Sequence, residues 1–408
     1  MNIDIDAVRS DFPILSETVH GRPLIYLDNA ASLQVSLPVI DAVTDYYRHT
    51  HANVHRGVHS LSQKATDFYE AARHTAAQFI GAADDEIIFT SGTTDGLNKL
   101  AGMLRPRLSA GTMILVSGME HHSNLLPWQA AARDTGADLQ IIPTAEDGSL
   151  DLQALAAMLT DAPAGTVIAV TLTSNVTGIV NPVGEIASLV HEAGGLLVID
   201  AAQGMKLGKI NVKTLDCDFL AFSGHKLGAL TGIGVLYGKH HLLEQLDPSV
   251  TGGGMVTSVS YQDFVPAGVP QCFEAGTPHI AGAVSLAAAI RYLEKIGGRD
   301  IGKREEQLTA LLVDALSAVE GICILGQDCS CRRSGAVSFD ISGVHSFDLG
   351  TMLDASGIAV RTGHMCAQPY VESFGVKSVV RISPAFYNTE DEILQTAETI
   401  RKLLPLLK

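Results

Sequence analysis

Residues 196–238 read LLVIDAAQGMKLGKINVKTLDCDFLAFSGHKLGALTGIGVLYG, and this stretch decides the fold class. Its three short apolar runs are bounded by glycine or by acidic residues: 196–199, 218–222 and 234–237. Runs of this length and composition are typical of buried β-strands. Because polar groups at strand ends face a crevice in an open α/β sheet, we expect Asp200 and Lys226, which follow the first two runs, to belong to one site.

An acid and a lysine at neighbouring strand ends suggest a particular cofactor. A lysine that forms a Schiff base, beside an acid that pairs with a pyridinium nitrogen, is the arrangement that holds pyridoxal phosphate (PLP). Taken singly, an aspartate at a strand end is more often a helix cap, and a lysine is usually solvated. The sequence Ser223-Gly224-His225-Lys226 favours the functional interpretation, because a hydroxyl, a glycine and an imidazole suit a phosphate.

The composition bounds the class of protein. The 408 residues are 46% hydrophobic and 18% charged, as in a compact globular protein of two or three domains. A formal net charge of −16 without a long basic run argues against nucleic-acid binding. The start, MNIDIDAVRSDF, does not resemble a signal peptide, and no apolar run approaches about 18 residues. We therefore expect a cytoplasmic protein with no nucleic-acid or membrane partner.

Six cysteines are scattered along the chain, at positions 217, 272, 323, 329, 331 and 366. This is not the pattern of a disulfide-dense secreted scaffold. Cys329 and Cys331 are the only close pair, and no second pair completes a zinc-site pattern. We expect five of the six to be ordinary buried or surface residues. Cys366 differs, because Arg361 and His364 in its glycine-containing loop favour a reactive thiolate.

Strands and helices alternate between about residues 86 and 238, which predicts a mostly parallel, doubly wound α/β sheet. Ligands bind beyond the carboxyl ends of the strands in such sheets. Five polar residues follow strand ends and are expected to converge there: Thr94, His121, Asn175, Asp200 and Lys226. The turn Ser91-Gly92-Thr93-Thr94 opens a helix, and its backbone N–H groups and hydroxyls suit a phosphate.

The pattern also predicts individual elements, inside and outside this alternation. Helices are expected over 66–79 and 97–103, and a single strand over 358–362. The segment 51–57, HANVHRG, is polar and rich in imidazole, which indicates a functional loop. The last third of the chain mixes helices with a few strands and predicts a smaller α+β domain.

Seven motifs occur in the order found in one enzyme family: Asn53–Gly57, Glu120–His122, Ser174–Gly178, Asp200–Gln203, Phe222–Lys226, Phe273–Pro278 and Arg361–Pro369. On these motifs the chain resembles the PLP-dependent fold-type-I enzymes of the class-V aminotransferase group. Within that group it looks like a group II cysteine desulfurase of the SufS/CsdA type, a set that includes selenocysteine lyases. The resemblance runs from about Asp11 to the C-terminus.

The resemblance implies an architecture for the whole chain. A large domain would contain a mostly parallel seven-stranded sheet, and a smaller α+β domain would follow it. The implied boundaries are 1–20 for an N-terminal segment that packs with the small domain, 21–285 for the large PLP-binding domain, and 286–408 for the small domain with the Cys366 loop.

The resemblance also implies a role for each site residue. Lys226 would carry PLP and move the Cα proton, with Asp200 on the pyridine nitrogen, Gln203 on the ring hydroxyl and His121 stacked on the ring. The remaining cofactor contacts would come from Thr93, Thr94, Asn175, Ser223 and His225, and Thr277 would reach the phosphate of the neighbouring subunit, which implies a homodimer. The substrate side of the site would contain Arg381, Asn175, His55 and Arg361. No metal site is implied.

Cys366 is the expected nucleophile. It would take sulfur from L-cysteine, which leaves L-alanine and a persulfide on Cys366. Because its loop is short, the resemblance implies transfer to a SufE/SufU-like sulfur acceptor protein, for iron–sulfur cluster or other sulfur-compound biosynthesis. L-Selenocysteine is a further expected substrate.

Four alternatives stand beside this hypothesis. Selenocysteine lyase and cysteine sulfinate desulfinase would use the same cofactor site without needing Cys366. A non-catalytic partner protein that kept the PLP fold is disfavoured by the complete set of Asp200, Lys226 and Cys366. A nicotinamide dehydrogenase is the weakest of these hypotheses, since no G-x-G-x-x-G opens a helix after the first strand.

The chain departs from the usual family pattern at a few positions. Ala229-Leu230 stands before Thr231-Gly232 where the family has Gly-Pro. The segment Gln34–Pro38 is two residues longer than usual and lacks a lysine, Met365 replaces a common second histidine, and His279 replaces an asparagine. Ala229-Leu230 is expected to alter the turn beside the cofactor, and the departures together bear on substrate preference and activity level rather than on cofactor binding.

Overall fold

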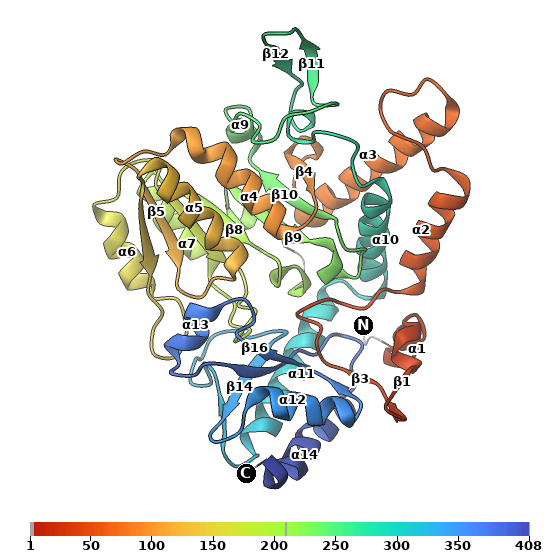
Figure 1. Cartoon of the computed structure of the whole chain (residues 1–408), viewed down its shortest axis with the longest axis vertical. Coiled ribbons are helices and arrows are strands. Elements are labelled where there is room, and N and C mark those ends of the chain that lie inside the picture. Colours follow the sequence, from red (N-terminus) through yellow and green to blue (C-terminus); the bar gives the residue numbers. More distant parts are fainter. Residues whose placement is uncertain (1–3, 209, 408) are drawn as a thin grey trace.

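The computed structural model describes residues 4–208 and 210–407. Its largest sheet has seven strands in the order β4-β10-β9-β8-β7-β5-β6 (Figure 1). β10 runs antiparallel to β4 and β9, and all other neighbours are parallel. The mostly parallel seven-stranded sheet is therefore confirmed. Its strands are β4 (Ile87–Thr90), β5 (Met113–Ser117), β6 (Asp138–Ile142), β7 (Val167–Thr171), β8 (Leu196–Asp200), β9 (Phe219–Ser223) and β10 (Gly234–Gly238).

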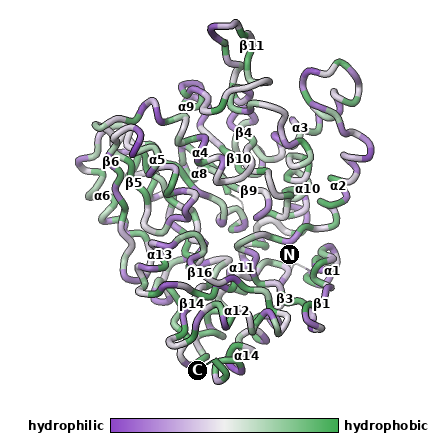
Figure 2. The backbone as a smooth tube through the Cα atoms, viewed as in Figure 1, coloured by the Kyte–Doolittle hydropathy of each residue, from purple (hydrophilic) through white to green (hydrophobic). Residues whose placement is uncertain are grey.

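The middle of this sheet is sealed from water on both faces. Every residue of β7, β9 and β10 is buried, which explains why these strands appear as continuous apolar runs rather than as alternating patterns. Figure 2 shows hydrophobic colours along the central strands and mostly hydrophilic colours in the loop between α2 and α3. The surrounding helices are α2 (Leu37–His49), α3 (Ser60–Ile80), α4 (Thr93–Leu104), α5 (Leu126–Thr135), α6 (Leu152–Thr160), α7 (Val183–Glu192), α8 (Val212–Leu215), α9 (His240–Leu243) and α10 (Ile280–Ile296).

The C-terminal third forms a separate antiparallel sheet with a hydrophobic core of its own. Its order is β13-β14-β17-β16, and helices pack against it below the large sheet in the view of Figure 1. These elements are β13 (Ile322–Ile324), β14 (Val337–Ile341), β16 (Arg361–Gly363), β17 (Val379–Ile382), α11 (Arg299–Ser317), α12 (Ser346–Ala355), α13 (Gln368–Ser373) and α14 (Glu390–Leu407).

The N-terminal segment of the chain packs against its C-terminal elements. α1 (Ile5–Ser10) lies beside the C-terminal elements (Figure 1), where Arg9 donates to the carbonyl of Tyr387 and forms an ion pair with Glu392. β3 (Ile25–Tyr26) pairs in parallel with β15 (Ile358–Ala359). Residues 1–3 of the expected N-terminal segment lie outside the described residues. Two small hairpins complete the strands, β1 (Thr18–Val19) with β2 (Arg22–Pro23) and β11 (Val256–Val259) with β12 (Phe264–Pro266).

Some elements differ from the sequence-based predictions. α3 begins six residues before the predicted Thr66, because His59 caps it by accepting from the backbone N–H of Ser62. The single strand predicted over 358–362 is two strands, since residues 358–359 pair with β3 and residues 361–363 pair with β17. The earlier helix start depends on a local histidine cap, whereas the divided strand depends on pairing partners that are distant in the sequence.

The cysteines also differ from expectation in one respect. Cys329 and Cys331, expected as ordinary separate residues, are joined by a disulfide in the connection between β13 and β14. Their spacing of two residues lets a turn bring both sulfur atoms together, although spacing alone does not distinguish a bonded pair from two thiols. Cys366 is a free, exposed thiol.

In the described part of the chain, no helix has both the length and the apolar character that a membrane crossing requires.

Candidate active site

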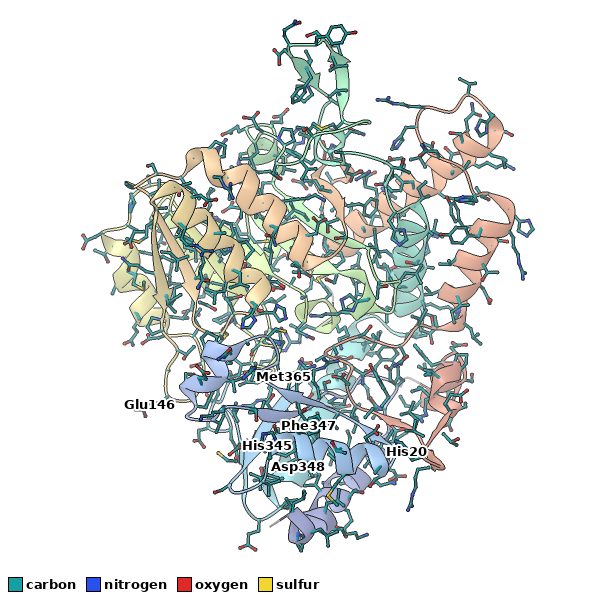
Figure 3. All side chains as sticks on the ribbon, in the orientation of Figure 1. His20, Glu146, His345, Phe347, Asp348 and Met365 are labelled. Atoms are coloured by element: carbon teal, nitrogen blue, oxygen red, sulfur yellow. A yellow bond between two sulfur atoms is a disulfide. The ribbon has the colours of Figure 1, made fainter. Side chains whose placement is uncertain are left out.

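A cavity of about 550 Å³ lies where strand ends of the large sheet meet the loop that carries Cys366. Figure 3 labels Met365, the residue before Cys366, at this boundary between the upper and lower elements. Twelve of the fourteen predicted site residues line the cavity: Thr93, Thr94, His121, Asn175, Asp200, Gln203, Ser223, His225, Lys226, Arg361, Cys366 and Arg381. The other two, His55 and Thr277, do not line it.

Asp200 and Lys226 form the charged centre of the cavity. Asp200 ends β8, is buried, and accepts a 2.8 Å hydrogen bond at Oδ1 from the N–H of Ala202. Burial raises the pKa of Asp200, and the positive charge of Lys226 opposes that effect. Burial also lowers the pKa of Lys226 to about 8, against the opposing attraction of Asp200. At pH 7 about a tenth of the amine is therefore uncharged and nucleophilic, far more than for an ordinary lysine.

A polar cradle lies at the N-terminus of α4. Gly92 has φ +149°, and a Cβ atom there would lie 3.2 Å from Oγ of Ser223. That Oγ accepts from the N–H of Thr93 at 2.8 Å and is 2.7 Å from Oγ1 of Thr93. Oγ1 of Thr94 is 2.7 Å from Oγ of Ser123. Hydroxyls gathered at the positive end of a twelve-residue helix fit a phosphate group.

The ring of His121, which lines the same cavity, is held in one orientation by a backbone hydrogen bond. Its Nδ1 accepts from the N–H of Ser123 at 3.0 Å, so the proton of the neutral ring lies on Nε2. Burial lowers the pKa of His121 to about 4, and the charge of Lys226 adds to this effect. At neutral pH the ring is therefore uncharged, and its Nε2–H can donate a hydrogen bond. His121 is one of the residues that line the cavity.

The turn that carries His121 is anchored by the preceding Glu120. This buried carboxyl accepts from the backbone N–H of Thr171 at 2.6 Å and from Nδ2 of Asn124 at 2.8 Å. It thereby ties the turn after β5 to the end of β7. Burial raises the pKa of Glu120 to about 8.

Two guanidinium groups form the wall opposite the large sheet. Arg361 on β16 and Arg381 on β17 are directly paired in register, and both donate to the carboxylate of Asp28. Arg381 is 2% exposed, and its Nη1 donates to the carbonyl of Asn175 at 3.0 Å. Its Nε has no hydrogen-bond partner among the described residues. A buried donor without a partner in a cavity wall fits a carboxylate ligand.

The Cys366 loop is held through its backbone. Met365 and Cys366 have φ values of +56° and +53°, the left-handed region that side chains rarely adopt. Nδ2 of Asn175 donates to the carbonyl of Met365 at 2.6 Å, and the N–H of His122 donates to the carbonyl of Cys366 at 2.6 Å. These bonds compensate for the unfavourable backbone and leave the exposed thiol at the cavity.

The remaining predicted residues have clear positions. His225 lies 3.3 Å from Oγ of Ser32 through Nδ1, and burial lowers its pKa to about 4. Nε2 of Gln203 donates to the carbonyl of Ala30 at 2.6 Å. His55 lies outside the cavity and contacts the carboxylate of Glu70 at 2.9 Å. Thr277 is exposed at the surface of its own chain.

Sequence reasoning missed Asp28, although the same signal that found Asp200 was present. Asp28 lies two residues after the short strand β3 and begins the run Asp28-Asn29-Ala30. At Leu230, where the family pattern has proline, the backbone N–H donates to Oγ of Ser285 at 3.1 Å. A proline has no such donor, so the departure from the pattern is matched by a hydrogen bond to α10.

Comparison with known proteins agrees with this geometry. Residues 25–395 match the model of the aminotransferase class-V family. The probable cysteine desulfurase of Halalkalibacterium halodurans is 44% identical over 397 residues, 97% of each chain. The apo cysteine desulfurase from Thermococcus onnurineus NA1 superposes with a TM-score of 0.94 at 38% identity, over 100% of this chain and 99% of that one. The cysteine desulfurase CsdA of Escherichia coli superposes with a TM-score of 0.91 at 36% identity, over the full length of both.

The chain therefore belongs to the aminotransferase class-V family. Within that family it is an enzyme of the cysteine desulfurase type, since full-length relatives of this similarity carry that name.

Proposed function

We propose that this protein binds PLP in the 550 Å³ cavity and converts L-cysteine to L-alanine, with the sulfur passing to Cys366. The observation that carries the proposal is that Lys226, Asp200 and Cys366 line one cavity. The family's relatives are named for desulfurase activity, and the cavity holds the amine, the acid and the thiol that this reaction needs.

The residues of the cavity fit PLP. The cradle at the N-terminus of α4, with Thr93, Thr94 and Ser223, would hold the phosphate. Asp200 would pair with the ring nitrogen, and Lys226 would hold the aldehyde carbon through Nζ. When bound, PLP supplies an electron sink that weakens the Cα–H and Cβ–S bonds of an amino acid.

The chain's own residues would position the substrate and move protons. Arg381 would bind the substrate carboxylate through its unpartnered Nε, with Asn175 beside it. Nζ of Lys226 would take the Cα proton and later return it, for which a pKa near 8 is suitable. His121, neutral at the pH of the cell, would donate from Nε2.

Cys366 would accept the sulfur. Its thiolate attacks the substrate sulfur, the Cβ–S bond breaks, and an S–S bond forms on Cys366. A proton replaces sulfur on Cβ, so that L-cysteine and one thiol become L-alanine and one persulfide. We further propose that a separate acceptor protein removes this persulfide, because the loop is bound to Asn175 and His122 and offers little reach.

We also propose that the working unit is a homodimer. Thr277 is exposed and does not line the cavity of its own chain. This position is expected for a residue that would contact the phosphate in a neighbouring subunit. The hairpin of β11 and β12 projects from the body of the chain (Figure 1) and carries the fully exposed Tyr261 and the largely exposed Val259. Light scattering of the purified protein should give twice the mass of the 43.1 kDa chain.

Mass spectrometry tests the proposed reaction most directly. After incubation of the PLP-loaded protein with L-cysteine, alanine should appear and the peptide with Cys366 should gain one sulfur. The variant Cys366→Ala should lose this activity at least a hundredfold, while Cys323→Ala, an exposed free cysteine on β13, should keep it. A Cys366→Ala variant that desulfurates L-cysteine at the parental rate would overturn the proposal, and retention of activity on L-selenocysteine alone would favour a lyase.

A further inference from the structure

A second group of chemically reactive side chains lies away from the active-site cavity. The sulfur atoms of Cys329 and Cys331 and a carboxylate oxygen of Asp147 all lie within 4.8 Å of one another. None of the three residues lines the active-site cavity. Asp147 belongs to the loop after β6, and Figure 3 labels its neighbour Glu146 where this loop reaches down toward the C-terminal elements. The group therefore joins two segments that are far apart in the sequence.

We propose that Cys329, Cys331 and Asp147 form a zinc site that is available only when the disulfide between the two cysteines is reduced. In the oxidised chain the two sulfur atoms are bonded to each other. Two equivalents of a thiol reductant convert the disulfide to two cysteine thiols and are themselves oxidised to one disulfide. Zn²⁺ then displaces the two thiol protons and binds both thiolates together with the carboxylate.

The chemistry of the donors selects the metal. Two thiolates favour zinc over calcium or magnesium, which prefer oxygen ligands only. Zinc–sulfur bonds of about 2.3 Å and zinc–oxygen bonds of about 2.1 Å place tetrahedral ligand atoms roughly 3.5–3.8 Å apart. After reduction, the two sulfur atoms must move apart from their bonded positions to reach that spacing, and the carboxylate oxygen, which lies within 4.8 Å of each, moves closer. Water would take the fourth position.

The surrounding hydrogen bonds hold the three ligands in place. Oδ1 of Asp147 accepts from the N–H of Ser149 at 2.9 Å and from its hydroxyl at 2.6 Å, which fixes the carboxylate. On the cysteine side, the N–H of Val180 donates to the carbonyl of Arg332 at 2.9 Å. This bond holds the residue after Cys331 against the loop that follows β7. Both segments are thus fixed by their own bonds before any metal binds.

The nearby positive charges are bonded to other groups. The guanidinium of Arg332 pairs with Glu306, and that of Arg333 donates to the carbonyl of Gly326. Among the described residues, Asp147 is the carboxylate that lies within 4.8 Å of both sulfur atoms.

Zinc binding to the full-length, PLP-loaded protein tests the proposal. The Cys366→Ala background removes the active-site thiol as a competing ligand. Protein reduced with a phosphine should retain about one zinc per chain after gel filtration, measured by elemental mass spectrometry, and protein oxidised at the disulfide should retain none. Adding Cys329→Ser or Cys331→Ser should abolish retention. Adding Asp147→Asn should weaken zinc binding at least tenfold, whereas Cys323→Ala should leave it unchanged.

The opposite results would overturn the site. These are a reduced chain that binds no zinc, zinc that persists without both cysteines, or Asp147→Asn binding as tightly as its parent. A chain in which the two cysteines cannot be oxidised to a disulfide would overturn the redox control. Alkylation needs no variant that might misfold: zinc should protect both cysteines of the reduced protein from iodoacetamide, and equal labelling with and without zinc would refute the proposal.

Discussion

Asp28 and Arg381 form a buried ion pair, with Nη2 of Arg381 3.2 Å from Oδ1 of Asp28. The same carboxylate accepts from Arg361, whose Nη2 lies 2.8 Å from Oδ2. One acid, two residues after β3, therefore orients two guanidinium groups carried by neighbouring strands of the C-terminal sheet. Burial lowers the pKa of Arg381, and Asp28 opposes this effect, which keeps the guanidinium charged.

The first prediction concerns this pair. Asp28→Asn removes the charge that holds Arg381 and leaves one acceptor oxygen for two guanidinium groups. We expect KM for L-cysteine to rise about tenfold, equivalent to about 1.4 kcal/mol, with kcat changed less than threefold. Steady-state alanine formation measures both constants. Asp354→Asn, which alters an exposed pair with His20, is the matched control and should leave KM unchanged. If Asp28→Asn has the parental KM, Asp28 does not position Arg381 for substrate binding.

The second prediction concerns the covalent attachment of the cofactor. Borohydride reduction of the PLP-loaded protein should fix the pyridoxyl group on the peptide that contains Lys226. Lys226→Arg retains a cation but has no amine of suitable pKa, so no peptide should gain that mass and alanine formation should fall at least a thousandfold. Lys213→Ala, an exposed lysine on α8, should behave like the parent. Attachment to any other lysine would contradict the assignment.

The sequence predicted the large sheet and most of the cavity because their causes are local. Buried parallel strands appear as short apolar runs, and residues directly after those runs meet at one edge of the sheet. Asp200 and Lys226 were found in this way. The predicted Thr94, His121 and Asn175 follow the same rule, and all five residues line one cavity.

The features that escaped prediction depend on contacts between distant segments. Asp28 acquires its role only because β16 and β17 bring two arginines to it, more than 300 residues later. The disulfide between Cys329 and Cys331 is a local exception: it joins residues two positions apart, and the spacing alone does not distinguish a bonded pair from two thiols. Spacing alone also did not show that Asn175 would hold the backbone of Met365.

The third prediction is a pH dependence of folding. Burial lowers the pKa of His121 from 6.5 to about 4, so between these values the unfolded chain binds a proton that the folded chain does not. The stability contributed by the neutral ring is complete above about pH 6.5 and is lost as the pH falls toward 4. Because the ring is mostly buried, the loss is on the order of 2–3 kcal/mol.

The variant His121→Gln should lack this contribution. Its melting temperature, measured on cofactor-free protein, should decline less between pH 7 and pH 4.5 than that of the parent. His74→Gln is the control, since His74 is more than half exposed and pairs with Asp84 at the surface. If both variants follow the parental pH profile, the low pKa of His121 is refuted.

The last prediction concerns the turn beside Lys226. Oγ of Ser285 accepts from the N–H of Leu230 at 3.1 Å and donates to the carbonyl of Gly282 at 2.6 Å, and Ser285 is fully buried. Ser285→Ala leaves the N–H of Leu230 without this partner in the interior, which should cost about 1–3 kcal/mol in urea unfolding. Ser188→Ala, which removes an exposed hydroxyl bonded within α7, should change stability by less than about 0.5 kcal/mol. Equal effects of the two substitutions would show that the hydroxyl of Ser285 does not replace, in this chain, the constraint that a proline at position 230 would provide.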